Sequence, residues 1–317
     1  MMMHCGAVFL PVWILLVVGS LPRGVAASEA INATAQEEKP AGFSWDVGPG
    51  TPAELPPGQL SLEDPVVPET LETLAGRIGW ARLADRSQMA PVRVVVTPVE
   101  SAEGRVGHQV QIAFTLQASL ASFQEKAGGE QALGVHADTA GNSVRLLTED
   151  EKEQADPGPQ DPEPQDPGPQ DPGPQDPGAT LGFLSMTLLN RVDLQGVVQA
   201  VRHDAADGVR LTWAFDHRFG NATGLQTCFR RWGSNPLGER VLGDPQPYAG
   251  AGGVIIARDV SELVEATDRP LLLVESRMVF AEPKDWFGGG NLLRAKIPLL
   301  AQEGVRNLRR RLAAEGK

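Results

Sequence analysis

Between residues 180 and 280 the chain carries about six strand-like runs, and an amphipathic helix pattern follows over residues 298–314. The runs cover residues 181–189, 194–203, 209–215, 225–232, 252–257 and 271–280. Most connections between them are short and turn-like, so neighbouring strands are expected to pair antiparallel. A meander that ends in a helix predicts an α+β fold, in which a curved antiparallel sheet grips the helix and encloses an apolar cavity.

Further elements are expected before residue 180. Residues 108–116 alternate apolar and polar side chains, with Val110, Ile112 and Phe114 on one side, and this predicts a half-buried strand. Residues 118–133 favour two short helices, because Gly128 and Gly129 interrupt the helix-forming pattern. Residues 93–99 fit a strand or an extended arm. Together with the later runs, these elements predict a sheet of about seven strands.

The N-terminal third is expected to lie largely outside the folded domain. Residues 5–21 form an apolar run, and Val25, Ala26 and Ala27 follow it, which is typical of a secretory signal covering residues 1–27. An uncleaved membrane anchor through residues 5–21 is the alternative. Residues 28–90 are rich in Gly and Pro and predict a largely disordered tether with one short helix near residues 68–83.

A low-complexity repeat, Asp-Pro-Gly-Pro-Gln, occupies residues 156–178, with Glu163 replacing one glycine. Frequent proline blocks helix and sheet, so residues 150–179 are expected to form a disordered acidic loop inserted into a domain that spans residues 91–317. A proline-rich ligand for another protein is the alternative to a spacer. The chain has a formal net charge of −12, and its acidic excess lies in the first 178 residues, which gives no reason to expect nucleic-acid binding.

The candidate chemical sites are few. No nucleophile elbow, phosphate-binding glycine loop or zinc-binding helix motif is present in the sequence. His203 with Asp204 and His217 with Asp216 are the pairs that suggest a metal or acid–base cluster, but both lie at strand ends, where polar residues are expected. Cys228 is expected to be a buried apolar residue of a strand. The sequence therefore predicts no metal, no cofactor and no catalytic residue.

The last strand supplies the best candidates for a binding site. One of its faces carries Val274, Ser276, Met278 and Phe280, which, with Trp213 and Phe215, are predicted to line an apolar ligand site. Glu275 and Arg277 project to the opposite face. An internal ion pair that orients the polar group of a ligand is one interpretation of this pair, and a solvated pair on the outer surface is the other, which the sequence favours.

The closing helix is predicted to cover one face of the sheet. Its apolar face contains Ile297, Leu300, Val305 and Leu308, and Arg306, Arg309, Arg310 and Arg311 are placed mostly on the other face. A basic amphipathic helix on a membrane surface is the alternative. Asn32 and Asn221 stand in N-glycosylation tripeptides, which matter only if the producing cell has that machinery.

The order of elements resembles the helix-grip fold of the START-like (SRPBCC-type) superfamily of lipid- and polyketide-binding proteins. In that family one strand precedes two short helices, six antiparallel strands and a long C-terminal helix. Here the strand at residues 108–116, the helices at 118–133, the ladder at 180–280 and the helix from Pro298 correspond to these parts. The resemblance covers residues 91–317, and it implies that the strand at residues 110–116 pairs with the ladder.

We therefore expect an exported, non-enzymatic protein that binds a small hydrophobic ligand or a lipid between the sheet and the C-terminal helix. A cyclase- or hydrolase-like enzyme that uses the same cavity, with Glu275, Arg277 or His203 as polar participants, is one alternative. A surface structural or interaction module without a ligand is another. Membrane contact is expected only if the N-terminal segment stays uncleaved. The ligand and the oligomeric state do not follow from the sequence.

Overall fold

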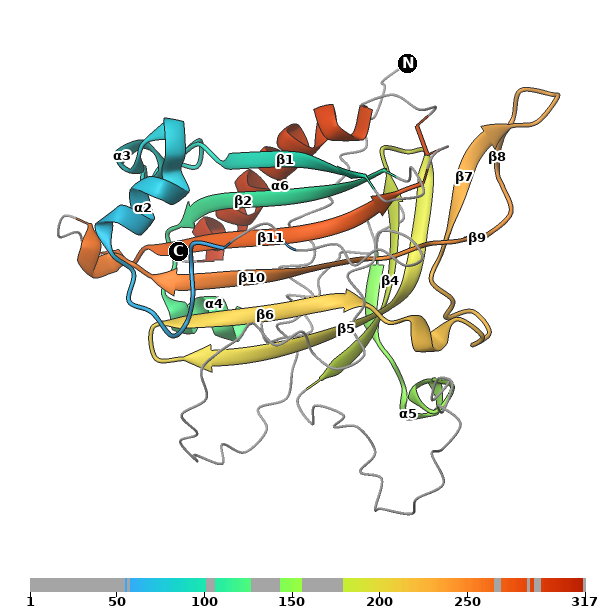
Figure 1. Ribbon diagram of the computed structural model, residues 1–317, viewed down its shortest axis with the longest axis horizontal. Helices are drawn as coiled ribbons and strands as arrows, with labels where there is room; N and C mark the ends of the chain where they lie inside the picture. Colours follow the sequence, from blue (N-terminus) through green and yellow to red (C-terminus); the bar gives the residue numbers. More distant parts are fainter. Residues whose placement is uncertain are drawn as a thin grey trace, which may run out of the picture.

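The computed structural model describes residues 55, 58–100, 106–126, 143–155, 179–264, 269–283, 286–287 and 292–315. These residues form an α+β structure with one large antiparallel sheet and a long C-terminal helix (Figure 1). The strands are β1 (Arg93–Glu100), β2 (Val106–Leu116), β3 (Ser143–Leu146), β4 (Thr180–Leu188), β5 (Val192–Ala205), β6 (Gly208–Phe215), β7 (Cys228–Ser234), β8 (Arg240–Leu242), β9 (Gln246–Pro247), β10 (Ala251–Asp259) and β11 (Leu272–Glu282). The helices are α2 (Pro68–Ala75), α3 (Trp80–Leu83), α4 (Leu120–Lys126), α5 (Glu149–Lys152) and α6 (Leu292–Glu315).

The sheet has eleven strands, so the expected number of about seven is wrong. Its main path runs β1-β2-β11-β10-β6-β5-β4-β3, and β7 joins β5, β8 and β9 beside this path. The additional strands lie mainly at the margins. β1 extends one edge and β3 the other, and β8 and β9 are short partners of β7. β3, β8 and β9 have only four, three and two residues, too few for a clear alternation of apolar and polar positions, and β1 had been predicted as a strand or an extended arm.

The strand before the proline-rich repeat does pair with the strands after it. β2 pairs antiparallel with β11 along its whole length, from Leu116 opposite Leu272 to Val106 opposite Glu282. This confirms the pairing expected for residues 110–116. On the other side of the molecule β3, which also precedes the repeat, pairs with β4, which follows it. Strands on both sides of the repeat therefore belong to one sheet, and the repeat itself, residues 156–178, lies outside the described residues.

The two faces of the sheet are both covered. We call the face that packs against α6 the inner face, and the opposite one the outer face. On the inner face, Val110, Ile112 and Phe114 of β2 belong to the same core cluster as Ile297, Ala301 and Val305 of α6. On the outer face, Ala113 and Leu273 pack with Leu71, Leu74 and Leu83 of α2 and α3. A central strand such as β11 is therefore buried on both faces, although Glu275, Ser276 and Arg277 interrupt its apolar sequence.

Helix α6 crosses β1 and β2 (red in Figure 1). It starts at Leu292, before the predicted start at Pro298, and the proline lies inside the helix. The prediction started the helix at Pro298 because proline suits the first turn. The expected placement of Arg309 on the polar face is also wrong. Its side chain is buried, since Arg309 is four residues after Val305 and therefore lies on the buried stripe.

Residues 58–90 pack on the outer face, so the expected tether does not extend to residue 90. Helix α2 ends at Gly76, and α3 begins after Gly79, and both glycines have positive φ, which suits this residue type (blue in Figure 1). Leu74 and Leu83 are fully buried. The predicted helix near residues 68–83 is therefore a broken one that covers the sheet. Residues 1–54, which include the predicted signal and the first part of the tether, lie outside the described residues.

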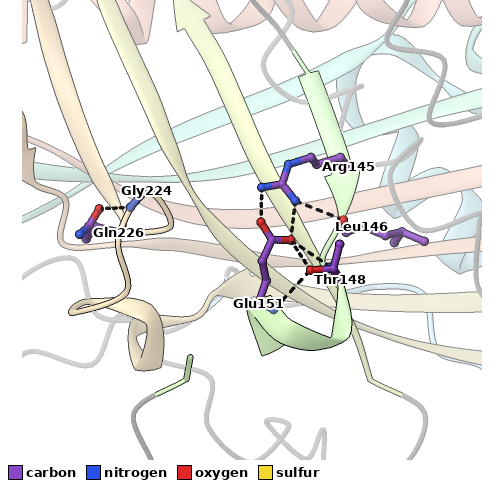
Figure 2. A network of polar contacts seen from close by, with 6 residues as sticks. All are labelled: Arg145, Leu146, Thr148, Glu151, Gly224 and Gln226. Carbon is purple, nitrogen blue, oxygen red and sulfur yellow. Dashed lines mark hydrogen bonds and ion pairs between the residues drawn. The ribbon is translucent and has the colours of Figure 1, made fainter. Parts of the chain in front are cut away.

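One polar network fixes the edge at β3 and α5 (Figure 2). Thr148 begins α5, where its hydroxyl accepts a hydrogen bond from the Glu151 N–H, and the Glu151 carboxylate accepts one from the Thr148 N–H at 2.9 Å. Arg145 of β3 donates to both oxygens of the Glu151 carboxylate, at 2.7 Å and 2.6 Å. This network holds the turn at residues 148–152 against the sheet edge.

Candidate functional site

The six residues predicted to line a site all lie buried on the inner face. Trp213 and Phe215 come from β6, and the others from β11: Val274, Ser276, Met278 and Phe280. The pairing register brings them together, since Gly253 of β10 lies opposite Trp213 on one side and Met278 on the other. Ser276 lies between Ile255 of β10 and Ile112 of β2. The predicted lining residues therefore form one continuous layer beneath the helices, which we call the inner layer.

Gly253 allows the Trp213 ring to lie close to the backbone of the neighbouring strand. A Cβ atom at residue 253 would lie 2.5 Å from the Arg277 carbonyl oxygen and 2.9 Å from the Trp213 Nε1 atom. Both distances are shorter than van der Waals contact allows. The glycine thus creates the space in which the indole N–H lies at the centre of the sheet.

Several polar atoms of the inner layer have no hydrogen-bond partner among the described residues. They include the Trp213 indole nitrogen and the Ser276 hydroxyl, and these two residues are only 2% and 1% exposed. The Nε1 atom of Trp286 and the Nδ1 atom of His108 also have no hydrogen-bond partner among the described residues. Buried polar groups are nearly always hydrogen-bonded, and leaving one unsatisfied costs about 1–3 kcal/mol. Four such atoms in one apolar layer are therefore the most informative feature of the site.

His108 lies at one end of the layer and contacts a carboxylate. Its Nε2 atom lies 2.5 Å from the Glu282 carboxylate, and its ring lies 5.3 Å from that of Phe280. Because the carboxylate contacts Nε2, it fixes the orientation of the imidazole. Nδ1 is left buried without a partner among the described residues. His108 was not among the predicted site residues, although it begins the predicted strand at residues 108–116 and lies opposite Phe280.

Aromatic side chains surround this end of the layer. Tyr248 stacks on Trp286 with ring centroids 5.3 Å apart, and Phe229 and Phe287 contact the other sides of the Trp286 ring. The Tyr248 hydroxyl donates to the Ala281 carbonyl at 3.1 Å, and burial raises the pKa of this phenol. The hydroxyl is therefore a fixed structural donor. Tyr248 and Trp286 were also missed, because both lie in loops without periodicity.

Glu275 and Arg277 do not face the inner layer, and they are not in solvent either. Both side chains lie on the outer face and are 1% and 2% exposed, so the predicted solvated pair and the predicted cavity ion pair are both wrong. Glu275 accepts hydrogen bonds from the backbone N–H groups of Gln59 and Leu60, at 3.0 Å and 2.8 Å. Residues 58–60 thus cover the two charges. This burial could not be predicted from the sequence, because the hydrogen-bond partners of Glu275 include backbone groups of a distant segment.

The remaining candidates lie away from the layer. His203 and His217 are exposed, and Asp216 uses its carboxylate to cap the short 3₁₀ helix at His217–Phe219. Within the described ranges no group of three His, Cys, Asp or Glu side chains is arranged to hold a metal ion. Cys228 is buried, as expected, and burial raises the pKa of its thiol. Asn221 is exposed in a turn, and Asn32 lies outside the described residues.

In the described part of the chain, no helix combines the length and the apolar character that crossing a membrane requires.

No family model matches the chain, and no curated protein matches it. Among solved structures, the human StarD13 (DLC2) lipid transfer and protein localization domain is similar, with a TM-score of 0.32 and 9% sequence identity over 67% of this chain and 89% of that chain. The α+β assignment rests on the strand order and register described above.

Proposed function

We propose that the protein is a non-enzymatic carrier or receptor for a small hydrophobic molecule or lipid, held in the inner layer between the sheet and α6. The unpartnered Trp213 indole nitrogen and Ser276 hydroxyl, buried within the apolar layer, are the observation that supports this function best. The long helix α6 that covers the inner face of the sheet, an element that the START-like resemblance also implies, supports it as well.

The chemistry of these atoms suggests what kind of ligand fits. An indole N–H is a donor only, so it requires an acceptor such as a carbonyl, ester or hydroxyl oxygen. The Ser276 hydroxyl can donate or accept, and the surrounding side chains are apolar. A ligand with a hydrocarbon body and one or two oxygen atoms would satisfy both groups. Its binding would offset part of the cost of burying them.

The enzymatic alternative loses the residues on which it was based. Glu275 and Arg277 belong to the outer face, and His203 is exposed at the end of β5. None of the three is placed to act on a molecule in the inner layer. A non-enzymatic role is therefore the proposal that fits the positions of the polar groups.

A direct test uses the full-length protein, stripped of lipid, and a fatty acid that carries a nitrobenzoxadiazole fluorophore. Binding in the inner layer brings this acceptor close to Trp213, so tryptophan emission should fall through energy transfer. Ser276→Ala should weaken binding about five- to tenfold, the value of one lost hydrogen bond in a dry site. Trp213→Phe should weaken binding similarly and remove part of the transfer.

The matched control is Trp80→Phe, because Trp80 belongs to α3 on the outer face. This variant should bind the labelled fatty acid as the unaltered protein does. Absence of binding would reject the proposed site. Binding that neither Ser276→Ala nor Trp213→Phe weakens would reject it as well.

Export is a separate part of the proposal. It is supported by the apolar run at residues 5–21 and the small residues that end at Ala27. Sequencing the N-terminus of the mature protein from its natural source tests it. A mature chain that begins after Ala27 supports release, and a chain that keeps residues 5–21 supports the membrane-anchored alternative.

A further inference from the structure

A second candidate site lies near the C-terminal end of α6, where this helix meets the end of β2 and the loop after α3. A pocket of about 340 Å³ opens there. Its size is within the range of small-molecule sites in proteins. The loop contributes Asp85, Arg86, Ser87 and Gln88; the sheet region contributes Thr115, Gln117, Arg269 and Pro270; and α6 contributes Arg309, Leu312 and Ala313.

Arg309 is the innermost charge of this pocket. It is only 7% exposed, and its guanidinium donates to the Thr115 carbonyl at 3.0 Å and 2.9 Å and to the Ala90 carbonyl at 2.6 Å. These partners are neutral. Burial lowers the pKa of this guanidinium to about 10, and the attraction of the Asp85 carboxylate opposes the shift only in part. A negatively charged group beside it would be stabilised.

The other charged residues of the lining increase this positive potential. Arg86 donates to the Arg269 backbone carbonyl at 3.0 Å, which places the Arg86 guanidinium beside the backbone of Arg269, and both residues belong to the lining. The lining therefore contains three arginines and one carboxylate, that of Asp85. This carboxylate already accepts hydrogen bonds from the Ser87 N–H and hydroxyl, both at 3.0 Å. These bonds lower the pKa of Asp85 and direct its oxygens towards its own loop.

We propose that this pocket binds an anionic oxygen group, a phosphate or a carboxylate, through Arg86, Arg269 and Arg309. The planar guanidinium fork suits both anions, because it offers two parallel donors to two oxygens. Ser87, Gln88 and Gln117 supply neutral polar groups around the same space, and Leu312 supplies an apolar wall. The inference does not depend on the proposed function, since none of these residues belongs to the predicted lining of the inner layer.

The anion could come from a free small molecule or from the headgroup of a lipid in a membrane. Two measurements on the full-length protein distinguish these sources: calorimetric titration with inorganic phosphate, and co-sedimentation with phosphatidylcholine vesicles that contain or lack phosphatidate. Arg86→Gln and Arg269→Gln each remove one charge at the rim and leave the buried Arg309 in place. Each should weaken binding about tenfold, and added salt should weaken it further.

Arg294→Gln is the matched control, since Arg294 is exposed in the first turns of the same helix. It makes the same change in net charge away from the pocket. If the protein binds phosphate, and only the two rim variants weaken this binding, the pocket is a site for a free anion. If the protein binds only the phosphatidate vesicles, and the same two variants weaken this binding, the pocket is a headgroup site. Absence of both, or an equal effect of Arg294→Gln, overturns the proposal.

Discussion

Glu275, in the middle of β11, accepts a hydrogen bond of 2.8 Å from the backbone N–H of Leu60. The same carboxylate accepts bonds from the Gln59 N–H and, at 2.6 Å, from the Gln111 side-chain amide. Arg258 of β10 continues this attachment, since it donates to the carbonyl oxygens of Ser61 and Asp64. The N-terminal segment at residues 58–64 is thus attached to the centre of the sheet by buried charges.

Replacing the carboxylate should loosen this attachment. In Glu275→Gln one oxygen becomes an amide NH₂ group, which is a donor and cannot accept from Gln59, Leu60 or Gln111. We expect the free energy of unfolding in urea to fall by about 2 kcal/mol, because hydrogen bonds to a charged acceptor are lost in a buried place. Proteolytic cleavage within residues 58–90 should become faster under native conditions.

The exposed Glu303 of α6 provides the control for this substitution. Glu303→Gln makes the same chemical change without burial and should leave both measurements unaltered. If Glu275→Gln unfolds at the urea concentration of the unaltered protein, the carboxylate does not hold the segment.

Gly253 should be intolerant of even one methyl group. A Cβ atom there would meet the Arg277 carbonyl oxygen at 2.5 Å and the Trp213 Nε1 atom at 2.9 Å. The carbonyl belongs to the backbone of the paired strand and cannot move without breaking the register. Gly253→Ala should therefore lower the free energy of unfolding by about 2 kcal/mol, as overpacking of a core does. Thermal or urea unfolding measures this.

A matched glycine exists in another strand of the sheet. No atom lies within 4 Å of the Cβ position at Gly233 of β7. Gly233→Ala should be neutral or slightly stabilising, because alanine restricts the unfolded chain more than glycine does. Equal effects of the two substitutions would contradict the close packing described at Gly253.

Part of this fold could be predicted from the sequence because it depends on local alternation. The alternation of Val110, Ile112 and Phe114 with their neighbours correctly identified β2 as a strand, but not as a half-buried one, because Ala113 and Thr115 on its outer face are buried too. Trp213 and Met278 were placed on an apolar face for the same reason, and both lie in the inner layer.

The rest depends on contacts between residues far apart in the chain. The burial of Glu275 results from the backbone of Gln59 and Leu60, which carries no side-chain signal. Arg309 has the spacing of the buried stripe of α6, but its charge led to a prediction of exposure. Only the two distant carbonyl groups of Ala90 and Thr115 explain its burial. Polar residues with remote backbone partners are thus the ones that periodicity misplaces.

The Ser276 hydroxyl offers a test of the inner layer that needs no ligand. Its oxygen is buried without a partner among the described residues, so its removal relieves a desolvation cost. Ser276→Ala should raise the free energy of unfolding of the lipid-free protein by about 1 kcal/mol. Ser234→Ala, at an exposed position of β7, should leave it unchanged. Destabilisation by Ser276→Ala would mean that the hydroxyl is hydrogen-bonded in the folded protein.

The stability of the sheet edge at β3 and α5 should fall in acid. The Arg145 guanidinium, together with the Thr148 N–H, lowers the pKa of Glu151 from 4.5 to about 2 (Figure 2). Because the pKa of this carboxyl is depressed by folding, its contribution to stability is present above pH 4.5 and is lost as the pH falls from 4.5 to about 2. The network lies at the surface, so salt should reduce the effect.

Carboxyl-detected NMR titration measures this pKa directly. In Arg145→Gln the pKa of Glu151 should rise towards 4.5, and the Leu147 N–H, which donates to the Leu181 carbonyl at 3.1 Å, should exchange faster with solvent. Glu149→Gln changes a neighbouring carboxylate that pairs with Lys152 and should leave the titration of Glu151 unaltered. A Glu151 that titrates near 4.5 in the unaltered protein would show that Arg145 does not hold the start of α5 against the sheet edge.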